Sequence, residues 1–251
     1  MKLYDWLEEQ PFTLSMSSGF FSFFAHAGML AALVDQGLKP VKLTGSSAGA
    51  LVGGCYASGC SIDELKEQLF ALQRDDFWDP GFGLGLLKGG LFQEQVRNIC
   101  KVSNVEDCPI PFRVSVFNLD SWDTEVIDQG NLTRAIAASC AFPFLFQPVA
   151  LNGARYLDGG IKDRPGLKGT QPGERILYHH INSRSPWRRK NSPALQVPQA
   201  VNMQAISING LPRVGPNKLH NGITAFDYAY DQTGELLQQT IAANDSSKQL
   251  Q

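Results

Sequence analysis

The fold is decided by one stretch, Thr44-Gly45-Ser46-Ser47-Ala48-Gly49-Ala50, a Gly-x-Ser-x-Gly pattern centred on Ser47. An apolar run precedes it and a helix-forming run follows, so the pattern predicts a strand, a tight turn and a helix. A serine on such a turn has strained dihedrals, and Gly45 and Gly49 stand where a Cβ would collide with a neighbouring strand or helix. The helix N-terminus would offer N–H groups to a negative oxygen. Ser47 is therefore a candidate nucleophile, and the alternative is a glycine-rich turn that only packs a helix against a sheet.

Composition indicates a globular protein without a nucleic-acid partner. The 251 residues carry a net charge of -2, with 43% hydrophobic and 18% charged side chains. These values are ordinary for a globular chain and give no electrostatic basis for binding nucleic acid. No Pro/Gly/Ser-rich linker divides the sequence, so we expect a single domain over residues 1–251, with a core at about 12–240 and a flexible tail at 244–251.

Cysteine spacing and the N-terminus indicate the compartment. The five cysteines form no Cys-x-x-Cys pair, and no acidic cluster has calcium-loop spacing, so no metal and no cofactor are implied. Residues 1–9 are acidic where a signal peptide is basic and then apolar, and we expect a cytoplasmic, unsecreted protein. Residues 11–34 lack charged side chains, but their serines and glycines suit a strand, a loop and a buried helix better than a membrane span.

Strand and helix patterns alternate along the chain. Strands are predicted at residues 12–16, 41–44, 112–118, 124–127, 149–151, 154–157 and 175–181, and helices at 25–36, 61–73, 91–100, 132–139 and within 227–243. Asn152-Gly153 is a strong hairpin signal, and residues 75–90, rich in glycine, proline and aromatic residues, predict a long loop. The alternation predicts an α/β domain around a mostly parallel sheet.

A nucleophilic serine needs a base, and histidine is the first candidate. A histidine-dependent α/β-hydrolase would use His179, His180 or His220, but only 46 residues precede Ser47, too few for the strands that precede the serine in that fold. In an apolar strand, His179-His180 is more typical of one buried histidine beside one that faces outward. The second candidate base is an aspartate that takes the serine proton directly.

Three motifs together resemble the patatin-like phospholipase family in letters, order and spacing. They are residues 44–51, residues 135–143 with Gln147-Pro148-Val149 after them, and Asp158-Gly159-Gly160. The resemblance implies a three-layer α/β/α sandwich around a mostly parallel central sheet, and a serine–aspartate pair without histidine. It makes Ser47 the nucleophile and Asp158 its base. Gly159 and Gly160 would let the backbone approach closely, so that the carboxylate lies beside Ser47 in a partly dry pocket.

The oxyanion loop departs from the family pattern. Family members usually carry a Gly-Gly-Gly-x-Arg/Lys-Gly loop before a helix with His-x-Gly-x-Leu, and that helix resembles residues 26–30 here, with His26 as a packing residue. The loop reads Ser18-Gly19-Phe20-Phe21-Ser22-Phe23, which keeps only Gly19 and has Ser22 in place of the basic residue. Because backbone N–H groups stabilise an oxyanion, Gly19 and Phe20 are the predicted donors. A lipid-binding or regulatory protein whose catalysis has decayed on the same scaffold therefore stays an open alternative.

Aromatic residues flank the predicted site and suggest a lipid substrate. Acyl-groove or core candidates are Phe20, Phe21, Phe23, Phe24, Phe142, Phe144 and Phe146. Candidates for a mobile cover or a membrane-touching surface are Phe77, Trp78, Phe82 and Leu84, since loops seldom bury so many apolar groups. Residues 187–190, Trp-Arg-Arg-Lys, suit either an anionic bilayer surface or a solvated basic loop. The sequence predicts a hydrolase of phospholipids or other lipid esters with peripheral membrane contact.

Overall fold

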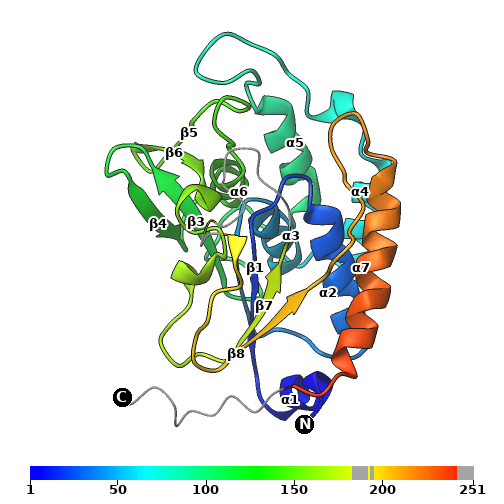
Figure 1. The fold of residues 1–251 in the computed structure, drawn as a ribbon. Helices are drawn as coiled ribbons and strands as arrows, with labels where there is room; N and C mark the ends of the chain where they lie inside the picture. The colour runs from blue at the N-terminus through cyan, green and yellow to red at the C-terminus, as the bar shows by residue number, and fades with distance from the viewer. Residues whose placement is uncertain (183–191, 193–194, 242–251) are drawn as a thin grey trace.

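The computed structural model describes residues 1–182, 192 and 195–241. A central sheet runs through this part of the chain, and helices flank it (Figure 1). The strands are β1 (Thr13–Met16), β2 (Lys42–Ser46), β3 (Phe112–Asn118), β4 (Asp123–Ile127), β5 (Val149–Leu151), β6 (Ala154–Asp158), β7 (Ile176–His180) and β8 (Met203–Ser207). The α-helices are α1 (Leu3–Glu9), α2 (Phe23–Asp35), α3 (Ala48–Ala57), α4 (Ile62–Ala71), α5 (Gly90–Ile99), α6 (Leu132–Ser139) and α7 (Asn221–Leu237). Three short 3₁₀ helices are η1 (Arg74–Asp76), η2 (Gly159–Ile161) and η3 (Leu167–Gly169).

The sheet has a parallel part and an antiparallel part. Strands β8, β7, β1, β2 and β3 lie side by side in that order and run parallel. Strands β4 and β6 pair antiparallel with β3, and β5 pairs antiparallel with β6. The predicted α/β fold with a mostly parallel central sheet and flanking helices is confirmed.

One face of the sheet is apolar and carries the α-helices. Side chains alternate along a strand, so Leu14 and Leu43, which are register partners, point to the same face and are fully buried. Helix α3 lies against this face so closely that a Cβ at Gly53 would come within 3.1 Å of the Phe112 ring. Outside it, α7 packs on α2, where a Cβ at Gly28 would lie 2.2 Å from a backbone oxygen of α7. The apolar core therefore lies between the sheet and its helices.

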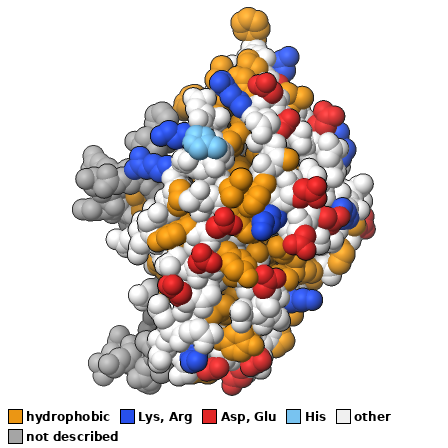
Figure 2. Space-filling view, turned by 90° about the vertical axis from the view of Figure 1, so that its right-hand side faces the viewer, with side chains coloured by type: hydrophobic (Ala, Val, Ile, Leu, Met, Phe, Trp, Pro, Cys, Tyr) orange, Lys and Arg blue, Asp and Glu red, His pale blue; other side chains and the backbone are white. Residues whose placement is uncertain are grey.

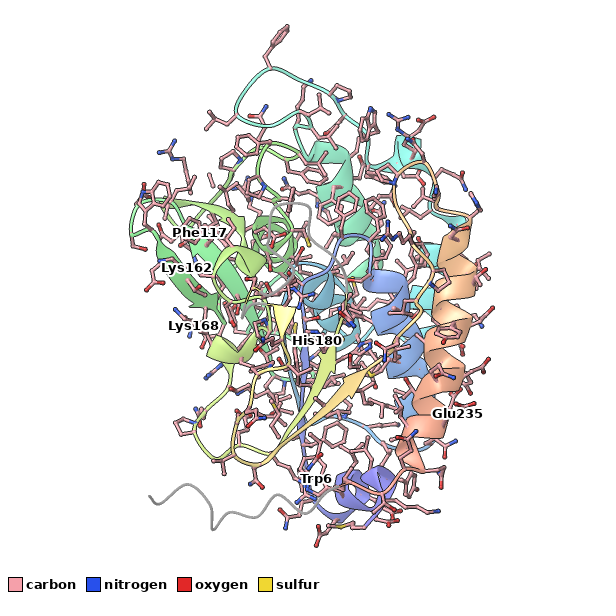
Figure 3. The ribbon with its side chains drawn as sticks, in the orientation of Figure 1. Trp6, Phe117, Lys162, Lys168, His180 and Glu235 are labelled. Carbon is pink, nitrogen blue, oxygen red and sulfur yellow. The ribbon has the colours of Figure 1, made fainter. Side chains whose placement is uncertain are left out.

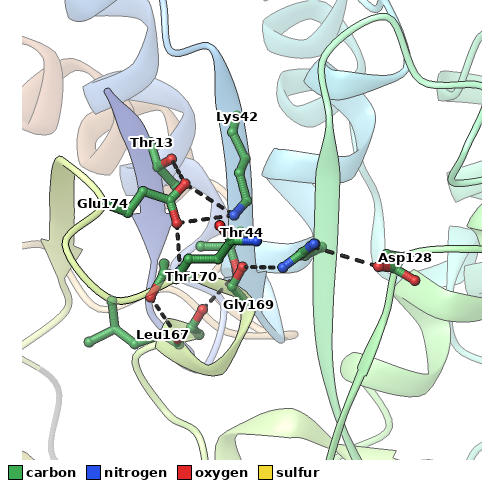
Figure 4. A network of polar contacts seen from close by, with 11 residues as sticks. Thr13, Lys42, Thr44, Asp128, Leu167, Gly169, Thr170 and Glu174 are labelled. Atoms are coloured by element: carbon green, nitrogen blue, oxygen red, sulfur yellow. Dashed lines mark hydrogen bonds and ion pairs between the residues drawn. The ribbon is translucent and has the colours of Figure 1, made fainter. Parts of the chain in front are cut away.

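The opposite face is polar and is covered by residues 159–174, which include η2 and η3 (Figure 4). The Thr44 hydroxyl donates to the Gly166 carbonyl at 2.7 Å, and the Thr13 hydroxyl donates to the Glu174 carboxylate at 2.5 Å. Lys42 Nζ lies 3.0 Å from the same carboxylate, and this ion pair is largely buried. These buried polar side chains have partners, whereas the buried Ser46 hydroxyl on the same face has none among the described residues.

Most of the predicted elements are present, and two that were not predicted are α1 and β8. The last helix begins at Asn221, six residues before the range predicted for it. None of the helices in the described residues is long and apolar enough to cross a membrane. The basic residues 187–190 and the tail 244–251 lie outside the described residues, and the single-domain expectation for 1–251 stays a prediction.

Candidate active site

Ser47 lies on a sharp turn between β2 and α3. Its backbone has φ 54° and ψ -118°, a positive φ that a side chain disfavours, and such strain costs on the order of 1–3 kcal/mol. The two glycines of the pattern make the turn sterically possible. A Cβ at Gly45 would lie 2.6 Å from the carbonyl carbon of Gly49, and a Cβ at Gly49 would lie 2.1 Å from the Met16 oxygen. The turn therefore holds the serine away from both elements, as its sequence predicts.

The edge of β3 brings the aspartate to this turn. Strand β4 occupies one edge of β3, and both β2 and β6 pair along the other edge. At the junction, Ser46 is the register partner of Ser115, and Asp158 is the partner of Val116, the next residue of β3. Because the antiparallel β6 ends where the parallel β2 ends, Asp158 meets the residue that follows Ser46. The position of Asp158 thus follows from strand register.

Ser47 and Asp158 are in direct contact. Ser47 Oγ donates a hydrogen bond to Asp158 Oδ2 at 2.6 Å, within the range expected for proton transfer between a nucleophile and its base. The other carboxylate oxygen, Oδ1, accepts the Gly160 N–H at 2.7 Å. Asp158 is 5% exposed, so the carboxylate is nearly shielded from water. The turn after it is tightly packed, since a Cβ at Gly159 would lie 2.0 Å from the Ser115 oxygen and one at Gly160 would lie within 2.3 Å of the Ser18 hydroxyl.

Two side chains at the end of α6 hold the serine turn, and the sequence analysis assigns them no role beyond membership of the motif at 135–143. Ser139 Oγ accepts the Ser47 N–H at 2.8 Å and donates to the Ser115 carbonyl at 2.7 Å. Cys140 Sγ donates to the Ser47 carbonyl at 3.2 Å. Burial, and then the charge of Asp158, raise the pKa of the Cys140 thiol well above its ordinary value, so the thiol stays a protonated donor. Residue type alone would not have identified either contact.

The predicted oxyanion loop lies beside the dyad. The Ser18 N–H donates to the Arg164 carbonyl at 2.7 Å, and both the Ser22 N–H and its hydroxyl donate to the Gly19 carbonyl. Among the described residues, none accepts a hydrogen bond from the N–H of Gly19 or Phe20. Phe20 and Ser47 line the same cavity. The loop thus has two N–H groups available at the position where the sequence predicts the donors.

A buried histidine pair supports this loop from beneath. His26 Nε2 lies 2.8 Å from the Ser17 carbonyl oxygen, which only a protonated nitrogen can bind. In the neutral ring, His26 Nδ1 is then an acceptor. It accepts a hydrogen bond from the N–H at His179 Nδ1, at 2.8 Å. This assignment leaves His179 Nε2 as a buried nitrogen without a hydrogen-bond partner among the described residues. Burial lowers the pKa of His26 to about 3 and that of His179 well below its ordinary value, so both rings are neutral at pH 7.

The other histidines are engaged away from Ser47. His180, labelled in Figure 3, contacts the Tyr178 hydroxyl through Nδ1 at 3.0 Å, and burial lowers its pKa to about 4. The expectation that one of His179 and His180 faces outward is wrong, because both faces of β7 are covered. His179 contacts His26 of α2, and His180 lies on the opposite face beside the buried Tyr178. His220 is exposed just before α7. The hydrogen bond of the Ser47 hydroxyl goes to a carboxylate and not to any of these rings.

An apolar cavity of about 110 Å³ opens at Ser47. Helices α3, α4 and α5 line it together with residues 20–23 and 140–146. Five of the predicted acyl-groove aromatics lie on its wall, namely Phe20, Phe21, Phe23, Phe142 and Phe146. The other two do not, because Phe24 is buried in the core and Phe144 is exposed. Phe77, expected in a mobile cover, is buried and lines the cavity. Within the described residues, no group of three His, Cys, Asp or Glu side chains could hold a metal ion.

Comparison with known proteins places this geometry in a family. The model of the Patatin-like phospholipase family matches residues 14–169, a range that contains both Ser47 and Asp158. The chain belongs to the patatin-like phospholipase family. The resemblance seen in the sequence motifs is therefore confirmed. The match includes residues 18–23, so the departure of this predicted oxyanion loop from the family pattern is a variation within the patatin-like domain.

Relatives of this patatin-like chain are longer proteins. It is 32% identical over 154 residues to an uncharacterized NTE family protein of Mycobacterium tuberculosis, over 60% of this chain and 42% of that protein. It is 27% identical over 146 residues to Lysophospholipase NTE1 of Scheffersomyces stipitis, over 55% of this chain and 9% of that protein. The chain thus spans less than half the length of these curated relatives.

A solved structure has a similar patatin-like arrangement. VipD from Legionella pneumophila superposes with a TM-score of 0.52 over 90% of this chain and 66% of that chain, at 15% sequence identity. At this identity the similarity concerns the fold alone. It extends beyond residue 169, where the family match ends, so most of the last third of the chain is also part of the shared fold.

Proposed function

We propose that the protein is a serine acyl hydrolase that cleaves ester bonds of glycerophospholipids or related lipids through a Ser47–Asp158 dyad. The observation that carries this proposal is the 2.6 Å hydrogen bond from a strained-turn serine to a nearly buried carboxylate, at the end of an apolar cavity. A lipid ester suits this cavity because its acyl chain needs an apolar wall and its carbonyl needs a nucleophile. Membership of a phospholipase family supports the same substrate class.

The dyad acts in two steps in this proposal. Ser47 Oγ attacks the ester carbonyl while Asp158 Oδ2 takes the hydroxyl proton, and the carbonyl oxygen becomes an oxyanion. When the bond to the alcohol breaks, Asp158 returns the proton to the leaving oxygen, and an acyl-serine remains. Water then attacks this acyl group with Asp158 again as base, which releases the fatty acid and restores Ser47.

Preorganised N–H groups stabilise the oxyanion in this proposal. The N–H groups of Gly19 and Phe20 have no acceptor among the described residues, and they belong to the loop that lies against the aspartate turn. The Gly160 N–H holds Asp158 Oδ1, which leaves Oδ2 to face the serine. Removal of one oxyanion donor typically reduces kcat by about a hundredfold to a thousandfold. The loop is therefore as important to turnover as the base.

Fatty-acid release tests the dyad. Wild type should release fatty acid from lysophosphatidylcholine and hydrolyse a p-nitrophenyl ester, and Ser47→Ala should abolish both. Asp158→Asn, which keeps the shape but cannot take the proton, should lower kcat by about a hundredfold to ten-thousandfold. His220→Asn is the matched control, since that ring is exposed and does not line the cavity at Ser47. Equal rates for wild type, Ser47→Ala and Asp158→Asn would refute the proposal.

A second function is supported by the loop at residues 18–23. It lacks the glycine-rich pattern, and Phe21 adopts a φ of 54° that glycine would tolerate better. A patatin-like scaffold whose hydrolysis has decayed would still bind lipid in the cavity. A fluorophosphonate probe separates the two functions, because labelling at Ser47 requires an activated serine. The absence of labelling, together with fatty-acid binding, would favour the decayed form.

The free thiols support a cytoplasmic location in this proposal. All five cysteines are unpaired, and two of them are buried in the core. An oxidising compartment favours disulfides, so free thiols fit a reducing one.

A further inference from the structure

A β-hairpin-like loop at residues 80–87 projects from the molecule. Pro80 and Leu87 form an antiparallel bridge, and the Gly81 N–H donates to the Leu86 carbonyl at 3.0 Å. In Figure 1 this cyan segment between η1 and α5 extends beyond the rest of the fold, at the end opposite α1. Figure 3 places Trp6 at that opposite end. The hairpin is thus a protruding feature at one pole of the molecule.

The hairpin is fixed by backbone contacts at its base. The Leu86 N–H donates to the Phe144 carbonyl at 3.0 Å, and the Leu87 N–H donates to the Leu145 carbonyl at 2.8 Å. A Cβ at Gly85 would lie 2.2 Å from the backbone of the same segment. Next to the hairpin, the Asp79 carboxylate accepts the N–H groups of Gly89, Gly90 and Leu91 where α5 begins, at 2.7–3.1 Å. The tip side chains are therefore held outward by a built framework.

Four apolar side chains stand exposed on this framework, and we call them the apolar platform. They are Phe82 (106% exposed), Leu84 (71%), Leu86 (50%) and Phe144 (79%). Residues 80–87 and 141–149 contain no Asp, Glu, Lys or Arg. Figure 2 shows hydrophobic side chains at this pole of the molecule. Exposed apolar groups gathered on one feature are typical of a binding surface.

The platform adjoins the cavity that leads to Ser47. Within residues 142–146, Phe142 and Phe146 line the cavity while Phe144 points to solvent. Phe20, which is half exposed and also lines the cavity, has its ring 6.3 Å from that of Phe142. One short segment thus forms both the inner wall and the outer surface, and an acyl chain could pass from the platform to the serine along an apolar path.

We propose that the apolar platform inserts into the interface of an uncharged, zwitterionic lipid surface, and that this contact delivers lipid to the cavity. This inference rests on the proposed function for its substrate. A lipid surface accepts a narrow convex tip, whereas a stable protein interface needs about 800 Å² per partner, more than four side chains on a hairpin provide. The exposed Lys88 lies against Gly81 at the base of the hairpin, but the four platform side chains carry no charge, so burial of these apolar groups supplies the attraction.

Vesicle binding tests the platform independently of catalysis. The protein carries Ser47→Ala, so that hydrolysis does not consume the phosphatidylcholine vesicles, and bound protein is measured by cosedimentation. Phe82→Ser with Leu84→Ser should lower the partition coefficient by about tenfold or more. The matched control is Val197→Ser with Val201→Ser, which removes two exposed apolar side chains elsewhere. The control should bind as the parent does, and 0.5 M salt should not weaken binding.

Catalysis provides the second readout, in the protein with Ser47 intact. The Phe82→Ser/Leu84→Ser variant should hydrolyse a water-soluble short-chain ester within about twofold of wild type, because neither side chain lines the cavity. Its rate on vesicles should fall about tenfold, in step with the loss of binding. Equal loss on both substrates would overturn the delivery role.

Several results would overturn the inference. The first is equal vesicle binding by the parent and the platform variant, and the second is binding that requires anionic lipid. The third is a dimer that sedimentation velocity detects in the parent and not in the platform variant. The last result would assign the platform to a second copy of the chain. If the protein binds vesicles through the platform but releases no fatty acid, the proposed hydrolysis is refuted and the proposed membrane contact of the platform is not.

Discussion

Three buried histidines make the stability of the fold depend on pH between 7 and 5. His26, His179 and His180 are at most 2% exposed. Burial lowers the pKa of His26 to about 3 and of His180 to about 4, and that of His179 well below its ordinary value. In the unfolded chain each would titrate near its ordinary value. Acidification therefore protonates the unfolded state first, and stability that is fully present above about pH 6.5 is lost as the pH falls.

The size of the effect follows from the proton count. Each histidine that binds a proton only in the unfolded state reduces the unfolding free energy by about 1.4 kcal/mol per pH unit. From pH 6.5 to 5 this is about 2 kcal/mol per histidine and about 6 kcal/mol for three, comparable with a typical total of about 5–15 kcal/mol. The carboxylates whose pKa the fold lowers, Glu64, Asp123 and Glu174, do not overlap with this window. Hydrogen bonds from Lys101 and Ser61 lower the pKa of Glu64 to about 2, so its contribution is lost only below about pH 4.5.

Urea unfolding followed by circular dichroism gives the unfolding free energy at pH 7.5, 6.5, 5.5 and 5.0, and hence the slope of this free energy against pH. Between 6.5 and 5 the slope should correspond to about three protons. His26→Gln keeps an amide donor for the Ser17 carbonyl but removes one titrating group, so its slope should fall to about two protons whatever its stability at pH 7.5. Val201→Gln, which replaces an exposed side chain that does not titrate, is the control and should keep the full slope. A flat profile in wild type, or an unchanged slope in His26→Gln, would refute the reasoning.

Three further substitutions test the framework of the site. Ser139→Ala leaves the Ser47 N–H and the Ser115 carbonyl without their hydrogen-bond partner. We expect kcat on a soluble ester to fall about tenfold with KM unchanged, and Ser139→Thr to restore most of the lost kcat. Gly49→Ala forces a Cβ to within 2.1 Å of a strand oxygen and should lower the unfolding free energy by about 2–4 kcal/mol, whereas Gly234→Ala, with open space around it in α7, should raise it by about 0.5–1 kcal/mol. Lys42→Met removes the partner of the part-buried Glu174 and should cost about 1–3 kcal/mol in thermal or urea unfolding, and a loss below 0.5 kcal/mol would contradict the role assigned to that pair.

Local patterns predicted the elements whose signals lie within a few residues. The alternation at Phe112–Asn118 and the helical period at Leu132–Ser139 gave the bounds of β3 and α6 as they are observed. The helix predicted at 61–73 follows from a capping box in the sequence, Ser61 with Glu64 three residues later, and in the structure the Ser61 hydroxyl accepts the Glu64 N–H. Strand β8 escaped prediction because Met203–Ser207 has one β-branched residue and no aromatic one. The burial of both histidines could not be predicted from the strand pattern, because it depends on α2 and residues 159–174 covering opposite faces of β7.

The part of the site that consists of short sequence motifs could be predicted. Ser47 and Asp158 were identified from their turns, and the structure brings them into contact, although their catalytic roles stay a prediction. The role of Ser139 in holding the serine turn could not be predicted, because it depends on where α6 ends relative to β3. Motifs name the reactive groups, while strand register and helix docking determine what supports them.

The contact between Ser47 and Asp158 joins residues 111 positions apart in the chain. Loop closure over such a separation is slow and unfavourable until the intervening strands have formed, so this contact belongs to a late step of folding. Because Asp158 reaches the serine only when β6 docks on β3, a partly folded chain exposes Ser47 without its base. Under the proposed mechanism, such a chain would not react with esters. The appearance of reactivity at Ser47 during refolding would therefore report that β6 has docked and the sheet is complete.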